Sequence, residues 1–324
     1  MGGVCAVAGL ESSLGERLSS NLRAVGNWEF RPYSRIDPLL GVNTLVVLNI
    51  ADYDLAGHRQ RPVIDDLRNA LDDASAHGVE NVVLLSSALV YGAWPNNPVP
   101  LTEESALRPN QRLQYARDLA VAEQLVDEWR RGGDQRRVVV LRAVPTMSAH
   151  HTGVLVRALA AGLGTRAAED DAPAQFLHDD DLVSAIRLVM DRDADGVFNV
   201  APDGAIPSDT LRALSGATPR IKLPGVVADA VSELRWNFQR GPIPPGLRPY
   251  VHSSWVVSNG KLRSIGWEPT VTNEQAFVEG TESKWWTMLT PKRKQEISLG
   301  LMVAGAFAAV LGIGFGVRKV LRGK

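Results

Sequence analysis

Two glycines near the start of the chain are spaced as in turns that bind a phosphate group. Gly9 and Gly15 are six residues apart, directly after the apolar run 4–8 and at the start of a helix-like stretch, 15–24. A turn of this kind lets backbone N–H groups and the positive end of the next helix approach a pyrophosphate, which requires residues with little or no side chain. We therefore expect a phosphate-binding turn here.

This turn belongs to a regular alternation of short and long apolar runs that continues to about residue 280. The short runs have four to seven residues, mostly β-branched or Leu, and the long ones have helical length. Such an alternation, without an internal repeat, is typical of a doubly wound α/β sheet. The expected strands are 4–8, 28–31, 44–50, 81–86 and 138–142, and the expected helices are 15–24, 62–77 and 114–131.

Composition narrows the class of protein further. The chain has 324 residues, 45% of them hydrophobic and 22% charged, which is enough for a large core and excludes collagen-like, disordered and disulfide-scaffold proteins. The formal charge of −1 is uneven, because residues 291–324 hold seven Lys or Arg and one Glu, a sum of +6 that leaves −7 for residues 1–290. A mildly acidic body has no basic patch to neutralise phosphate groups, so it is not expected to bind nucleic acid.

The basic C-terminal region surrounds an uncharged apolar segment, residues 297–317. As a helix, these 21 residues span about 31 Å, roughly the thickness of a bilayer's hydrocarbon core. Trp285 and Trp286 precede the segment, and Lys and Arg lie on both sides of it, as is usual in the headgroup region. We expect a transmembrane helix followed by a basic tail, 318–324; the alternative is a buried or interfacial helix rich in Gly and Ala.

The cellular compartment is indicated by two features of the N-terminal part. Cys5 is the only cysteine, so it has no internal disulfide partner, and no signal-peptide pattern follows Met1. We expect the main domain in the cytoplasm, held at the cytoplasmic membrane by a single-pass C-terminal anchor.

A second segment carries a resemblance to a known family. SSALVYG at 86–92, PLTEE at 100–104 and RPN at 108–110 precede YARDL, which begins at Tyr115. These residues resemble the active-site strand and loop of the extended short-chain dehydrogenase/reductases, specifically the NAD-dependent epimerase/dehydratase group. HDDDL and IGWEP, further along, are similar to later segments of that family, and the resemblance covers about residues 4–280.

The resemblance implies a Rossmann-type doubly wound parallel sheet with a smaller C-terminal substrate subdomain. The corresponding boundaries are 1–175 for the NAD(P)-binding domain, with sheet elements recurring up to about 205, and 176–285 for the substrate-binding subdomain. It also implies a small-molecule substrate, such as a nucleotide sugar or related envelope precursor, and a homodimer formed through the helices at 62–77 and 114–131.

The resemblance also implies particular catalytic residues. In this family a tyrosine moves the hydroxyl proton while hydride passes between substrate and nicotinamide, and a Ser or Thr hydrogen-bonds the reacting oxygen. Ser87 occupies the Ser/Thr position and Tyr115 the tyrosine position. Leu119 occupies the position of a lysine that lowers the tyrosine's pKa and holds the nicotinamide ribose. Arg112, three residues before Tyr115, is a candidate for the missing positive charge.

Cofactor-binding positions follow in the same way. Gly9, Ser12 and Gly15 occupy the glycine loop; Ser12 replaces the middle glycine, so its side chain either blocks the backbone from phosphate or contacts phosphate as a helix N-terminal hydroxyl. Arg31 and Arg35 lie where an acidic residue usually binds the adenosine ribose. The cofactor is expected to be NAD or NADP, and the two arginines favour NADP.

No metal site is expected, because His150 and His151 are adjacent and no cluster of Cys or carboxylate residues is near them in sequence. Two functions therefore fit the sequence. One is a membrane-anchored NAD(P)-dependent oxidoreductase of the epimerase/dehydratase type. The other is a catalytically impaired dinucleotide-binding protein that regulates or positions a partner at the membrane.

Overall fold

The computed structural model describes part of the chain in detail. The predicted membrane segment 297–317, its basic tail, and His150 and His151 lie outside the described residues. Within the described ones, no helix is both long enough and apolar enough to cross a membrane. The described ranges are 3–10, 12–25, 28–35, 39–48, 63–149, 152–164, 172–215 and 245–282.

The described residues form a six-stranded sheet in the order β2-β1-β3-β4-β5-β8, and every neighbouring pair of strands is parallel. Its central strands are continuous apolar runs because helices cover both faces of a parallel sheet. The chain places β2 on one side of β1 and β3 on the other, so the strand order reverses at β1. The strands are β1 Val4–Ala8, β2 Glu29–Pro32, β3 Thr44–Val47, β4 Asn81–Ser87, β5 Arg137–Ala143 and β8 Gly196–Val200.

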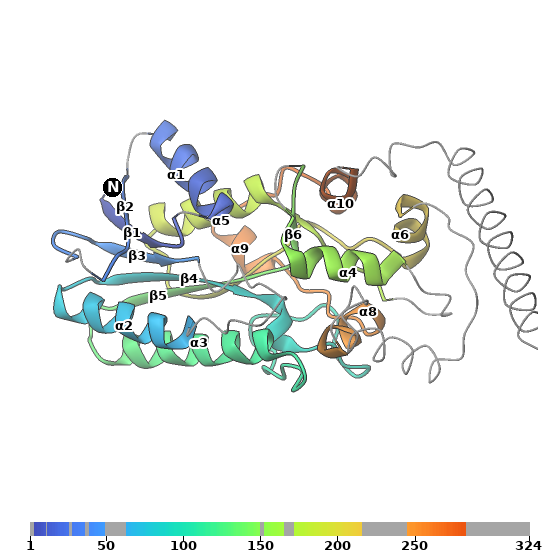
Figure 1. Ribbon diagram of the computed structural model, residues 1–324, viewed down its shortest axis with the longest axis horizontal. Coiled ribbons are helices and arrows are strands. Elements are labelled where there is room, and N and C mark those ends of the chain that lie inside the picture. The colour runs from blue at the N-terminus through green and yellow to red at the C-terminus, as the bar shows by residue number, and fades with distance from the viewer. Residues whose placement is uncertain are drawn as a thin grey trace, which may run out of the picture. The chain divides into compact units, whose positions relative to one another are not determined.

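Helices cover the two faces of this sheet in pairs. Figure 1 shows α1 and α5 on one face and α2 and α3 on the other. Each helix buries one stripe; in α2, for example, Leu67, Ala70, Leu71 and Ala74 recur at helical spacing and are at most 5% exposed. These helices are α1 Ser13–Val25, α2 Val63–Ala76, α3 Gln114–Arg131 and α5 Asp179–Asp191.

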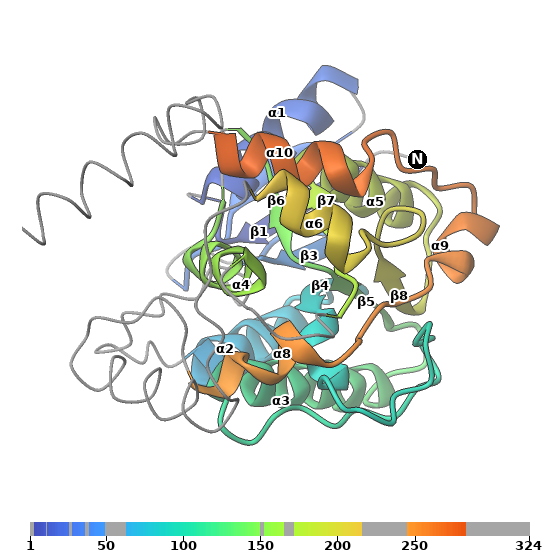
Figure 2. The same ribbon diagram turned by 90° about the vertical axis from the view of Figure 1, so that its right-hand side faces the viewer.

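The remaining elements gather at the carboxyl ends of β4 and β5, the end of the sheet that faces the viewer in Figure 2. A second sheet here consists of two short parallel strands, β6 and β7. The elements are η1 Ala88–Tyr91, β6 Thr146–Met147, α4 Val154–Gly164, β7 Leu177–His178, α6 Ser208–Leu214, η2 Pro245–Leu247, α8 Pro249–His252, α9 Gly260–Ser264 and α10 Asn273–Glu282.

The segment 245–282 is attached to this end of the sheet by hydrogen bonds. The buried Tyr250 hydroxyl donates to the Leu89 carbonyl at 2.7 Å. Burial raises the pKa of this phenol, which therefore stays protonated as the donor. Leu101 adds two backbone hydrogen bonds, to the Val256 carbonyl and from the Ser258 N–H, both 2.8 Å. The segment 245–282 is thus hydrogen-bonded to η1 and to Leu101, although it is far from both in sequence.

The α/β parallel-sheet fold is confirmed. The predicted helix 114–131 has the observed bounds of α3, whereas the predicted strand 28–31 is displaced by one residue. Strand β8 lies inside the range up to about 205 over which sheet elements were expected to recur. Residues up to Gly280 form one compact unit, so the predicted boundary at residue 175 stays a prediction, as does the homodimer.

A buried ion pair connects three of these elements. The Arg142 guanidinium on β5 donates to the Glu123 carboxylate on α3 at 2.8 and 3.1 Å, and both residues are nearly inaccessible. Ser86 on β4 donates to the same carboxylate at 2.5 Å. Burial disfavours the charged guanidinium, but the attraction and hydrogen bonds of Glu123 outweigh it, so the pKa of Arg142 lies above its ordinary value.

Arg142 also forms a hydrogen bond outside its ion pair with Glu123. It donates to the Tyr91 hydroxyl at 2.8 Å, and Tyr91 in turn donates to the Asn199 side-chain carbonyl at 2.7 Å. Glu103 accepts the Asn199 backbone N–H at 2.8 Å. Strand β8 is therefore joined to the same buried polar network.

Replacing Glu123 with Leu should leave Arg142 as an uncompensated buried charge and lower the free energy of unfolding by about 3–5 kcal/mol, measured by urea denaturation. The matched control is Asp127→Asn on the same helix, which removes an exposed pair with Arg131 and should cost less than about 1 kcal/mol. Equal losses in the two variants would contradict the structural role of the buried pair.

Candidate active site

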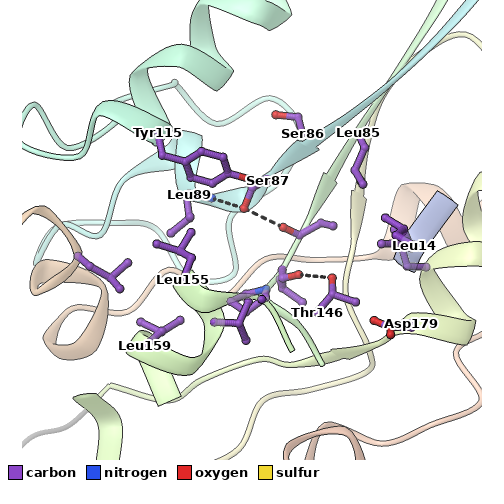
Figure 3. Close-up of a pocket in the computed structure, with 17 residues that line it drawn as sticks. Leu14, Leu85, Ser86, Ser87, Leu89, Tyr115, Thr146, Leu155, Leu159 and Asp179 are labelled. Carbon is purple, nitrogen blue, oxygen red and sulfur yellow. Dashed lines mark hydrogen bonds between the residues drawn. The ribbon is translucent and has the colours of Figure 1, made fainter. Parts of the chain in front are cut away.

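A cavity open to solvent, about 800 Å³ when the solvent at its mouth is included, lies at the carboxyl ends of β4 and β5. The strand ends, η1 and the first residues of α3 form one side of it, and α4 and the start of α5 form another (Figure 3). Its lining is mostly apolar. The apolar side chains in the lining are Leu14, Leu85, Leu89, Ala143, Val144, Pro145, Leu155, Val156, Leu159, Leu182 and Leu247.

Ser87 and Tyr115 both line this cavity. Ser87 ends β4, where its hydroxyl donates to the Ala143 carbonyl at 3.1 Å and accepts from the Leu89 N–H at 3.3 Å. Tyr115 is the second residue of α3 and only 4% exposed, and its ring points toward Ser87 (Figure 3). The two residues that the family resemblance pairs are thus brought together from two separate elements.

Leu119 lies one helical turn after Tyr115 and is completely buried in the core. Arg112 is exposed and is not among the residues that line the cavity. The described lining of the cavity contains no lysine or arginine. Leu119 therefore provides no positive charge beside the phenol.

The glycine turn has the geometry that its sequence predicts. Gly9 has a φ of 90°, a conformation that residues with a side chain rarely adopt. A Cβ at Gly15 would lie 2.4 Å from the Gly9 carbonyl oxygen and 2.7 Å from the Leu10 Cα, so only glycine allows this approach of α1 to the turn. The turn follows β1, at the point where the strand order reverses and where open α/β sheets bind ligands.

Ser12 completes this turn. Its hydroxyl donates to the Gly9 carbonyl at 2.6 Å and accepts from the Gly15 N–H at 3.1 Å, which is the geometry of a helix N-cap. The hydroxyl is therefore held at the N-terminus of α1. The turn fits a pyrophosphate at this end, whereas Leu119 supplies no cation for the nicotinamide ribose.

The two predicted arginines have different surroundings. Arg31 lies within β2, opposite Ala6, and its guanidinium forms an exposed ion pair with Glu29 at 2.9 Å. Arg35 is exposed and lies beyond the carboxyl end of β2. Because ligands of such sheets bind outside the carboxyl ends of the strands, Arg35 is better placed than Arg31 to meet an adenosine ribose.

The one charged residue in the described lining of the cavity was not predicted from the sequence. Asp179, in the run HDDDL, lines the cavity, while its two neighbours have other roles. Asp180 pairs with Arg17, and Asp181 accepts backbone N–H groups of Thr270 and Val271 at 2.9 and 3.0 Å. Three consecutive carboxylates indicate a helix start, and only the folded chain shows which of them faces the cavity.

Parts of this sequence are similar to known proteins, and its fold is similar to solved structures. Residues 64–201 match the model of the NAD dependent epimerase/dehydratase family. An uncharacterized protein of Mycobacterium tuberculosis is 27% identical over 203 residues, 62% of this chain and 54% of that protein. The chain thus spans about half the length of this relative. UDP-glucose 4-epimerase 2 of Oryza sativa is 36% identical over 87 residues, 27% of this chain and 20% of that enzyme.

Solved structures are similar over most of the chain. MoeE5 in complex with UDP-glucuronic acid and NAD is 18% identical with a TM-score of 0.61, over 87% of this chain and 98% of that one. RMD from Pseudomonas aeruginosa complexed with NADPH is 21% identical with a TM-score of 0.59, over the same shares. UDP-glucose 4-epimerase from Thermotoga maritima is 18% identical with a TM-score of 0.60, over 86% and 98%.

These three structures each cover 86% or 87% of this chain. The chain has a Rossmann-like parallel-sheet fold shared with nucleotide-sugar epimerases, and its residues 64–201 match the NAD dependent epimerase/dehydratase family.

Proposed function

We propose that this chain is an NAD(P)-dependent oxidoreductase of the epimerase/dehydratase type, held at the cytoplasmic membrane by residues 297–317. The observation that carries this proposal is the meeting of Ser87 and Tyr115 in one cavity at the carboxyl edge of a parallel sheet that also presents a glycine turn. Solved proteins of similar fold were obtained with NAD or NADPH, which supports a nicotinamide dinucleotide here.

The turn at Gly9, Ser12 and Gly15 would hold the pyrophosphate, and the dinucleotide would supply or accept the hydride. Ser87 and Tyr115 orient the substrate's reacting oxygen between a hydroxyl and a phenol. Tyr115 moves the proton of that oxygen. In the direction of carbonyl reduction, Tyr115 would donate its phenolic proton to that oxygen.

The expected nucleotide-sugar substrate is supported by the ligands named for similar solved structures, among them UDP-glucuronic acid. The alternative function, a dinucleotide-binding scaffold without turnover, is favoured by one observation. The lysine position is filled by Leu119, an apolar side chain that belongs to the core.

Tyr115→Phe removes the donated proton and keeps the ring that fills the cavity edge. With full-length protein in detergent and a panel of ketone substrates that includes a UDP-4-keto sugar, NADPH oxidation should fall by about 100-fold or more. NADPH binding, followed by its fluorescence, should be unchanged. Binding without turnover in the native chain would favour the scaffold, and no binding of NADH or NADPH would overturn both functions.

Arg35→Ser tests the choice between NADP and NAD. Loss of a charge-assisted contact to the 2′-phosphate should weaken NADPH binding by about tenfold and leave NADH binding unchanged. Arg31→Ser is the matched control, because Arg31 pairs with Glu29 on the strand and should not affect either dinucleotide. Equal effects of the two substitutions would contradict a specific role of Arg35.

A further inference from the structure

An ion pair joins the N-terminal parts of α1 and α5, two helices that pack against each other on one face of the sheet (Figure 1). The guanidinium of Arg17 on α1 lies 3.6 Å from the carboxylate of Asp179, the first residue of α5, and it also pairs with Asp180. Leu14 of α1 and Asp179 line the same cavity (Figure 3). The pair therefore lies beside the place that the proposed function gives to the dinucleotide.

The charge of Asp179 has little compensation apart from Arg17. The Asp179 side chain is only 2% exposed, so solvent hardly screens it. Its Oδ2 accepts from the neutral hydroxyl of Ser148 at 2.6 Å, and its Oδ1 has no hydrogen-bond partner among the described residues. The positive end of α5 favours a carboxylate here, but a helix end carries only a partial charge. Arg17 supplies the full positive charge beside it.

An uncompensated charge at this place would act on a bound dinucleotide. The glycine turn would hold the negatively charged pyrophosphate at the N-terminus of α1, the helix that carries Arg17. The cavity between the two helix starts has an apolar lining, which includes Leu14 and Leu182. In such surroundings two negative charges repel each other much more strongly than in water, and this repulsion needs no contact between them.

We propose that Arg17 is a positioning residue for the dinucleotide, which neutralises Asp179 and thereby allows the pyrophosphate to bind at the N-terminus of α1. This proposal rests on the proposed function. The two partners differ in exposure, because the side chain of Arg17 is 25% exposed and that of Asp179 is buried. Loss of Arg17 therefore leaves a buried negative charge, whereas loss of the Asp179 charge leaves a cation that water can hydrate.

The experiment measures NADH binding to the full-length chain in detergent, followed by NADH fluorescence. Arg17→Gln should weaken binding by about tenfold, because the charge of Asp179 then opposes the pyrophosphate. Asp179→Asn should not weaken binding. The double variant should recover the native affinity to within about threefold. An ion pair that only holds the two helices together predicts the opposite, namely weaker binding in all three variants.

Arg17→Lys keeps the charge and should keep the native affinity. The matched controls are Arg187→Gln and Asp191→Asn, which make the same charge changes in a half-exposed pair, 3.8 Å apart, toward the other end of α5. Neither should affect NADH binding. A second measurement, urea denaturation, needs no dinucleotide. Arg17→Gln should lower the unfolding midpoint, and adding Asp179→Asn should raise it again, because the uncompensated buried charge is removed.

Native affinity in Arg17→Gln, weaker binding in Asp179→Asn, or equal effects of Arg17→Gln and Arg187→Gln would overturn the proposal. If Asp179→Asn does not fold, the comparison of Arg17→Gln with Arg17→Lys and Arg187→Gln remains decisive. Absence of both NADH and NADPH binding in the native chain would overturn the proposed function and this proposal together. Dinucleotide binding that does not depend on the charge of Arg17 would overturn this proposal alone.

Discussion

The cavity depends on the buried ion pair between Arg142 and Glu123, because this pair joins β4, β5 and α3, three of the elements whose ends form the cavity. Arg142 precedes Ala143, whose carbonyl accepts from Ser87, and Ser86 donates to Glu123 itself. Glu123 lies two helical turns after Tyr115 on α3. The ion pair thus sets where the phenol lies relative to the serine, and a buried charge tolerates little displacement from its partner.

Leu119 lies between Tyr115 and Glu123 on the same face of α3. Tyr115, Leu119 and Glu123 follow one another at intervals of one turn, and all three are buried. A leucine here extends the core up to the phenol, so the helix is stabilised by packing at the position where the family resemblance implies a charge. At this position of α3, an apolar side chain favours the stability of the fold, whereas a positive charge would favour proton transfer.

The sequence was sufficient for the parts of the molecule that depend on local periodicity. The helix 114–131 and the turn at Gly9 and Gly15 could be predicted because apolar spacing and missing side chains are visible in a single segment. The family resemblance paired Ser87 with Tyr115. The position of Asp179 in the cavity lining could not be predicted, because its contacts with Arg17 of α1 and with Ser148 form only after folding. Short strands such as β6 and β7 likewise have too few residues to show a period.

The attachment of the C-terminal segment has a consequence for the order of folding. Leu247 lines the cavity, and Tyr250 is hydrogen-bonded to Leu89, although well over one hundred residues separate the two in the chain. Contacts between such distant residues form late, since closing the long intervening loop costs entropy before the contact repays it. During synthesis, the sheet up to β5 can assemble while the wall contributed by Leu247 is still missing. The apolar cavity then lacks this wall until the last quarter of the chain is synthesised, and transiently exposed apolar surface of this kind favours aggregation.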